Sequence, residues 1–298
     1  MKLATTTGDY SLYTNSQEVA LQHIRQAGFK HADYSFCFDA CFGNGIFSND
    51  YQRHIDSVNN LLDKIDLKLV QAHAPMGKAF LDGGELIKIT KRCIDACAKW
   101  EIPNIVVHSH YKEGLSREQT FEENKKFYLP LLEHAEKYGI NILTENFNRM
   151  CVKGLYWIDN APDLLKMIET VNHPLFHALW DIGHANMQEM PQDEALRLLS
   201  NHVRGFHIHD NMGDHDSHLA PFLGSVNLDA VITGMLDIGY NDYFTFEVGR
   251  FFLLPENRRK FERSKRLESA SIELRDAFER YLYQLGKCVL EKYDCFEE

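Results

Sequence analysis

The sequence predicts an α/β fold, a (β/α)₈ TIM barrel with a long C-terminal helical extension. Eight short β-rich runs alternate with longer segments of helical periodicity. Strands that alternate with helices form parallel sheets, and eight such units close into a barrel of about 250 residues. The chain has 298 residues, which leaves room for further helical sequence. We expect residues 1–254 to form one barrel domain and residues 255–298 to form the extension.

The predicted strands are short and rich in β-branched and aromatic residues, which are typical of buried strands. Each helical segment between them ends at a turn signal. The predicted strands cover residues 3–7, 32–36, 69–74, 104–109, 141–146, 176–181, 203–209 and 243–248.

Two of the intervening segments show helical spacing clearly, because their apolar residues recur along one face. The Tyr138-Gly139 pair predicts the end of the second helix, and Asn160-Ala161-Pro162 predicts a capped start for the next one. The apolar face of the first segment holds Leu86, Ile89, Cys93, Ile94, Cys97 and Trp100, and that of the second holds Phe121, Tyr128, Leu131, Leu132, Ala135 and Tyr138.

The extension also shows helical spacing, which predicts a long helix that packs on the barrel or on a partner subunit. The apolar run at residues 251–254 would suit a homo-oligomer interface as well. The apolar positions of this predicted helix are Leu267, Ala270, Leu274, Ala277, Phe278, Tyr281, Leu285 and Val289.

The composition is that of a globular protein, with 44% hydrophobic and 25% charged residues. The net charge of −11 makes nucleic acid an unlikely partner. No run of about 18 apolar residues and no signal peptide is present, so we expect a cytoplasmic protein without a membrane partner. The seven cysteines include no CxxC pair, which favours reduced thiols over disulfides or a zinc knuckle.

Polar residues interrupt the predicted strands close to their carboxyl ends, where active sites lie in this fold. Two glutamates and an aspartate that converge there would repel one another unless a cation offset their charge. Carboxylates with histidine suit Mn²⁺, Zn²⁺ or Co²⁺, so we expect a divalent metal and no organic cofactor. The residues, one from each of strands three to eight, are His73, His108, Glu145, Asp181, His207 and Glu247.

Further ligand types follow strands six and seven. His184 comes three residues after Asp181, and Asp216 and His218 lie in a loop rich in histidine and aspartate. These residues could hold a second or third ion or bind substrate hydroxyls. The pairs His108/His110 and His207/His209 have matching parity, so spacing does not choose between their members.

Seven segments together resemble the xylose isomerase-like TIM barrels, which include sugar and sugar phosphate isomerases and epimerases and metal-dependent apurinic-site endonucleases. The resemblance extends over about residues 1–250. The segments are QAHAPMG (71–77), VVHSH (106–110), LTENF (143–147), WDIGHA (180–185), RGFHIHDN (204–211), DSHLAPFLGSVN (216–227) and FTFEV (244–248).

The resemblance implies a metal held by Glu145, Asp181, His207 and Glu247. It also implies that the two glutamates transfer protons while the metal stabilises an enediolate. The expected function is therefore a divalent-metal-dependent isomerase or epimerase of a sugar or sugar phosphate, which is a small-molecule carbohydrate substrate. The resemblance selects His108 and His207 from the two histidine pairs.

Three further residues bear on the substrate. Trp180 lies near the predicted mouth and would stack on a sugar face. Arg250 would grip a phosphate or carboxylate. Cys151 stands six residues after Glu145, where free-ketohexose epimerases of this superfamily tend to have a glutamate, and this departure argues against a free-ketohexose 3-epimerase.

Two alternatives remain. His73, His108, His184, Asp216 and His218 also resemble the additional ligands of an apurinic-site endonuclease, a trinuclear zinc phosphodiesterase. We favour the isomerase because the residues after His73 lack the aromatic side chains that would wedge into DNA, and because the loop after strand seven resembles that of sugar phosphate isomerases. The second alternative is a metal-containing barrel subunit that acts with a partner protein.

Overall fold

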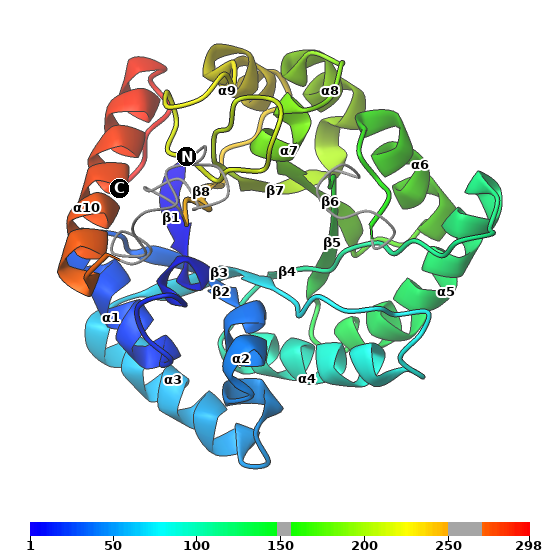
Figure 1. The fold of residues 1–298 in the computed structure, drawn as a ribbon, viewed down its shortest axis with the longest axis horizontal. Helices are drawn as coiled ribbons and strands as arrows, with labels where there is room; N and C mark the ends of the chain where they lie inside the picture. Colours follow the sequence, from blue (N-terminus) through cyan, green and yellow to red (C-terminus); the bar gives the residue numbers. More distant parts are fainter. Residues whose placement is uncertain (148–155, 250–269) are drawn as a thin grey trace, which may run out of the picture.

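Eight parallel strands form the centre of the molecule, and the helices surround them (Figure 1). The computed structural model describes residues 1–147, 156–249 and 270–298. The strands are β1 (Lys2–Thr6), β2 (His31–Ser35), β3 (Lys68–His73), β4 (Asn104–Val106), β5 (Asn141–Glu145), β6 (Phe176–Asp181), β7 (Val203–His207) and β8 (Tyr243–Phe246).

The strands follow one another in chain order around the sheet, and β1 pairs with both β2 and β8. The remaining gap lies between β7 and β8, and two backbone hydrogen bonds bridge it. Ile208 N–H donates to the Thr245 oxygen over 2.8 Å, and Glu247 N–H donates to the Ile208 oxygen over 3.1 Å. The sheet is thus a nearly closed barrel, which confirms the predicted fold class.

The outer layer consists of helices that pack against the strands and against one another. The predicted caps form: Asn160 accepts a hydrogen bond from Asp163 N–H at the start of α6, and Pro162 occupies its first turn. The helices are α1 (Gln17–Ala27), α2 (Phe36–Phe42), α3 (Tyr51–Ile65), α4 (Glu85–Lys99), α5 (Arg117–Ala135), α6 (Ala161–Val171), α7 (Ile182–Asn186), α8 (Gln192–Leu199), α9 (Leu228–Asp237) and α10 (Ile272–Lys292).

Strand β4 ends three residues earlier than the sequence predicts. Beyond the end of β4, the side chain of Asn124 on α5 makes hydrogen bonds to the backbone of His110, in place of a neighbouring strand. The Asn124 Oδ1 accepts from His110 N–H over 2.6 Å, and its Nδ2 donates to the His110 oxygen over 2.8 Å. The predicted apolar face of α5 is also wrong at one position, because Tyr138 lies beyond the end of the helix and is exposed.

The C-terminal helix α10 packs on α1 and β1 of its own chain (Figure 1). Its predicted apolar face is wrong at Leu274 and Tyr281, which are each 47% exposed, whereas Val289 is buried as predicted. A Cβ at Gly286 would lie 2.7 Å from Leu3 and 2.8 Å from Phe246, so this glycine allows close packing. The face that packs inward holds Arg275, Glu279, Leu282, Gly286, Val289 and Leu290.

Residues 250–269 lie outside the described residues, so the proposed domain boundary at residue 254 stays a prediction, as does the place of Leu267. Among the helices that the structure describes, none is both long enough and apolar enough to cross a lipid bilayer.

Most of the apolar core lies between the strands and the helices. A separate small cluster of Val106, Leu143 and Leu179 lies apart from it. The strand faces that carry Glu145, Asp181 and His207 are continuous with this cluster, because residues two apart on a strand share a face. The polar residues therefore project into the carboxyl-terminal mouth of the barrel.

Candidate active site

The carboxyl ends of the strands bring histidines and carboxylates together at one end of the barrel. Most of these side chains are buried, but those of Asp216, His218 and Glu247 are 17%, 21% and 24% exposed. The gathered residues are His73, His108, Glu145, Asp181, His184, His207, His209, Asp216, His218 and Glu247.

Three carboxylates converge on one ring nitrogen of His207. Its Nδ1 lies 3.2 Å from Glu145 Oε1, 3.5 Å from Glu247 Oε2 and 4.0 Å from Asp181 Oδ2. Three carboxylate oxygens and one imidazole nitrogen at these separations are a suitable ligand set for a divalent ion of the Mn²⁺, Zn²⁺ or Co²⁺ type. The residues present therefore fit a metal.

Glu145 also takes part in a second group with His73 and His108. The Nε2 atoms of the two histidines are 3.1 Å apart. Glu145 Oε2 lies 3.7 Å from His73 Nε2 and 3.5 Å from His108 Nδ1. This carboxylate oxygen is buried and has no hydrogen-bond partner among the described residues. A buried carboxylate oxygen without a partner favours a bound cation or ligand at this point.

A third group lies on the other side of Asp181 and contains His184, His209, Asp216 and His218. Asp216 Oδ2 is 3.4 Å from His184 Nε2, and its Oδ1 is 3.2 Å from His218 Nε2. The rings of His209 and His218 stack at 4.0 Å. His218 has a φ of +46°, in the left-handed region that few non-glycine residues adopt. The backbone is thus strained where it directs this imidazole into the group.

Burial and charge act against each other in these groups. Burial disfavours the charge on His218, but Asp216 outweighs it and raises the His218 pKa to about 10. Burial would raise the pKa of Glu145, but His207 and His108 hold it well below its usual range. Protonated imidazoles can therefore offset the charge of the buried carboxylates, and a divalent ion would supply the same positive charge.

Local hydrogen bonds fix Asp181 in place. Its Oδ1 accepts from His184 N–H over 2.7 Å and so caps α7, while its Oδ2 lies 3.0 Å from His209 Nε2. The side chain of Asn146 bonds both the N–H and the carbonyl oxygen of Asp181, over 2.8 and 2.9 Å. An aspartate whose backbone and side chain are both held by hydrogen bonds in this way is pre-organised for binding.

The structure brings together every histidine and carboxylate that the sequence selected, from His73 to Glu247. His110 is placed elsewhere: its ring packs on Phe127 and Tyr156, and burial lowers its pKa to about 4. The predicted stacking role of Trp180 is wrong. This side chain is 1% exposed and donates from Nε1 to Gln192 Oε1 on the outer side of the strand. Arg250 and Cys151 lie outside the described residues.

Three residues near the site were not singled out from the sequence. His209 contacts Asp181, and its parity with His207 was the only signal for it. Asp33 and Gln71 lie beneath His207. Each of these two is a polar residue in the middle of a buried strand. This signal is present in the sequence but was not used in the prediction.

A cavity of about 320 Å³ opens beside the group of Glu145, Asp181, His207 and Glu247. It lies between β1, α2 and the residues after β8. Glu247 and His218 form one side of it, and Asp9 contributes a carboxylate. Hydroxyl groups of Thr6, Ser11 and Ser35 complete the polar lining. This space gives a small polar molecule access to Glu247.

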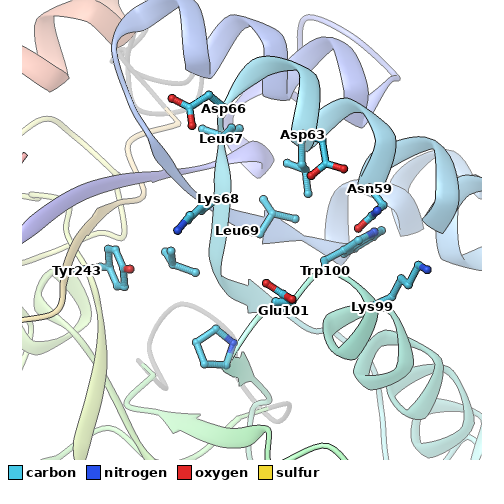
Figure 2. A pocket seen from close by; sticks show the side chains of 13 residues that line it. Asn59, Asp63, Asp66, Leu67, Lys68, Leu69, Lys99, Trp100, Glu101 and Tyr243 are labelled. Atoms are coloured by element: carbon cyan, nitrogen blue, oxygen red, sulfur yellow. The ribbon is translucent and has the colours of Figure 1, made fainter.

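A second cavity, of about 690 Å³, lies at the opposite ends of the strands (Figure 2). Lys68 and Tyr243, which begin β3 and β8, line it together with Trp100. None of the gathered histidines and carboxylates lines this cavity. It is therefore separate from the candidate active site.

Histidine and carboxylate side chains at the mouth of a parallel barrel are the features that point to the class of this protein. The chain belongs to the xylose isomerase-like TIM barrel family, whose pattern matches residues 21–266. Fructoselysine 3-epimerase of Escherichia coli O157:H7 is 27% identical over 128 residues, which are 41% of this chain and 44% of that protein.

Solved structures show the same fold at low sequence identity. L-ribulose 3-epimerase is 17% identical with a TM-score of 0.73, over 98% of this chain and 95% of that one. An AP endonuclease, family 2, from Brucella melitensis is 18% identical with a TM-score of 0.69, over 85% of this chain and 94% of that one. A sugar epimerase and an AP endonuclease family 2 protein thus share this architecture.

Proposed function

We propose that this protein is a divalent-metal-dependent isomerase or epimerase that acts on a sugar or sugar phosphate. The observation that carries the proposal is the convergence of Glu145, Glu247 and Asp181 on the Nδ1 atom of His207. The similarity to fructoselysine 3-epimerase supports an epimerase more than a hydrolase.

The metal would be held by Glu145, Asp181, His207 and Glu247, and it would be Mn²⁺, Zn²⁺ or Co²⁺. When bound, it would act as a Lewis acid and stabilise negative charge on the carbonyl and adjacent hydroxyl oxygens of the sugar. No organic cofactor is needed, because moving a proton between carbon positions requires no electron acceptor.

Glu145 and Glu247 are the acid and base of this proposal. They come from β5 and from the residue after β8, so they reach the site from different sides. One carboxylate removes the proton from carbon, and the other returns a proton. Glu247 lines the cavity of about 320 Å³ and so meets the substrate there. His184 and His218 would bind substrate hydroxyls beside it.

The test is exchange of a substrate C–H proton with solvent in deuterated water, followed by NMR across sugars and sugar phosphates. We expect Glu145→Gln and Glu247→Gln to abolish the exchange while the circular dichroism spectrum stays unchanged. Glu291→Gln, at an exposed position of α10, is the matched control and should exchange at the wild-type rate. Full exchange in both site variants would refute the assignment.

A second candidate is a trinuclear zinc phosphodiesterase resembling the apurinic-site endonucleases. It is favoured by the two further groups, one of His73, His108 and Glu145, the other containing His184, Asp216 and His218. Elemental mass spectrometry of gently purified protein separates the candidates. About one ion per chain supports the isomerase, whereas about three zinc ions support the phosphodiesterase and call for an abasic-DNA cleavage assay.

A further inference from the structure

Two buried polar residues lie directly beneath His207. Gln71 Nε2 donates a hydrogen bond of 2.6 Å to Asp33 Oδ2, and the same Nε2 lies 3.1 Å from His207 Nε2. Asp33 Oδ2 is 3.5 Å from that ring nitrogen. Asp33 has no exposed surface, and its Oδ1 has no hydrogen-bond partner among the described residues. An ionisable group this deep in a barrel needs a specific role to offset the cost of burial.

The strand register places these side chains at one level of the barrel. The pairing of β2 with β3 shifts after Ala32, so that Asp33 pairs with Gln71 and the two side chains share a face. The pairing of β6 with β7 shifts as well, and pairs Leu179 with Gly205. Such bulges often re-aim side chains next to active sites.

Gly205 makes room for Gln71. A Cβ at this position would lie 2.5 Å from Gln71 Oε1, which is closer than real Cβ contacts. The absence of a side chain on β7 therefore allows the Gln71 amide to lie between Asp33 and His207. Glycine at position 205 thus makes room for the hydrogen-bonded side chains of Gln71 and Asp33.

The two nitrogens of His207 face different partners. Nδ1 faces Glu145 and Glu247, and Nε2 faces Asp33 and Gln71. A neutral imidazole that binds a cation through Nδ1 carries its proton on Nε2, and this buried N–H needs an acceptor. Histidines that bind metals usually donate their second N–H to a carboxylate or carbonyl oxygen. Asp33 Oδ2, 3.5 Å from Nε2, is the carboxylate oxygen on that side. Because Gln71 Nε2 also carries hydrogens and lies closer to the ring nitrogen, the Gln71 amide must turn its N–H groups toward Asp33 for the hydrogen bond from His207 to form.

We propose that Asp33 is a positioning residue that fixes His207 with its proton on Nε2 and its Nδ1 free for a divalent ion. Gln71 holds the Asp33 carboxylate in place through its amide N–H. This inference rests on the proposed function, because it requires an ion at the group of Glu145, Asp181, His207 and Glu247.

The experiment measures the affinity of the metal-free protein for Zn²⁺ by competition with a chromophoric chelator. Loss of such a partner typically weakens metal binding about 10- to 100-fold, and we expect this for Asp33→Asn and Asp33→Ala. Gln71→Leu should show a smaller loss in the same direction. Thr245→Val, at another buried polar position of the barrel, is the control and should bind like the wild type.

A second readout reports the position of the proton. Long-range ¹H–¹⁵N spectra of the zinc-loaded wild type should show His207 protonated at Nε2, and Asp33→Asn should change this signature. Wild-type protein that binds no divalent ion would overturn both the proposed function and this inference. Wild-type affinity in folded Asp33→Asn, with the same His207 spectrum, would overturn this inference alone.

Discussion

Arg275 of the C-terminal helix donates a hydrogen bond of 2.7 Å to the backbone oxygen of Val248, the residue that follows Glu247. The same guanidinium is fully buried, lies 3.4 Å from Asp9 Oδ2 and bonds Glu279 one turn further along α10. The helix thus holds the carboxyl end of β8, from which Glu247 enters the active site.

Replacement of Arg275 tests this anchor. Removing one partner of a buried ion pair leaves uncompensated charge, so Arg275→Met should lower the free energy of unfolding by about 3–5 kcal/mol. Lys287→Met, which removes an exposed pair with Glu291 on the same helix, should cost at most about 1 kcal/mol. Urea unfolding measures both values. Equal effects of the two replacements would contradict the anchoring role.

Asp9 should make stability fall as the pH rises. Burial raises the pKa of Asp9 from 3.8 to about 7, although Arg275 opposes this effect. A carboxyl group with a raised pKa favours the folded state while it is protonated, and this contribution is lost between pH 4 and 7. Urea unfolding at pH 5 and pH 8, in the presence of a chelator, should show a loss on the order of 2–3 kcal/mol that Asp9→Asn lacks. The same pH dependence in both proteins would rule out this titration.

Gly205 and Gln71 should be energetically coupled. Gly205→Ala forces a Cβ against the Gln71 amide and should cost about 1–3 kcal/mol by overpacking. Gln71→Ala vacates that space, so the double variant should be less destabilised than the sum of the single variants, by roughly 0.5–3 kcal/mol. A double-mutant cycle of unfolding free energies provides the measurement. Strict additivity would show that the two side chains do not compete for space.

Removal of divalent ions should lower the melting temperature. A ligand at 100 times its Kd stabilises the folded state by about 2.7 kcal/mol. Ion binding displaces a proton from His207, whose pKa Glu247 and Glu145 raise well above its usual range despite burial, so the affinity should fall as the pH falls. Melting curves with and without chelator at pH 8 and pH 6 test this. A chelator effect that is absent at pH 8, or larger at pH 6, would contradict it.

The sequence predicted which residues lie close together where the topology of the fold determines it. Once strands alternate with helices, the ends of all strands must meet, so Glu145, Asp181 and His207 could be brought together without coordinates. The bounds of β6 agree with the prediction at both ends. Trp180 shows the limit of this reasoning, because it directly precedes Asp181 and so points to the opposite face of the strand.

Other features depend on contacts between distant parts of the chain. The buried face of α10 is set by the ion pair of Arg275 with Glu279 and by the close approach at Gly286, neither of which an apolar periodicity detects. His110 leaves the cluster because β4 has already ended and Asn124 redirects its backbone. Asp33 and Gln71 meet through a shift in strand register, which a single sequence does not reveal.

The pairing of β1 with β8 has a consequence for synthesis of the chain on the ribosome. β1 is made well before β8, so one of its two edges has no partner until Tyr243–Phe246 has been made. At usual translation rates this interval lasts roughly 10–50 s. An unpaired strand edge is a template for pairing with other chains. The same strand order that places Glu247 beside Glu145 and Asp181 therefore leaves the newly made protein open to aggregation until its eighth strand has been translated.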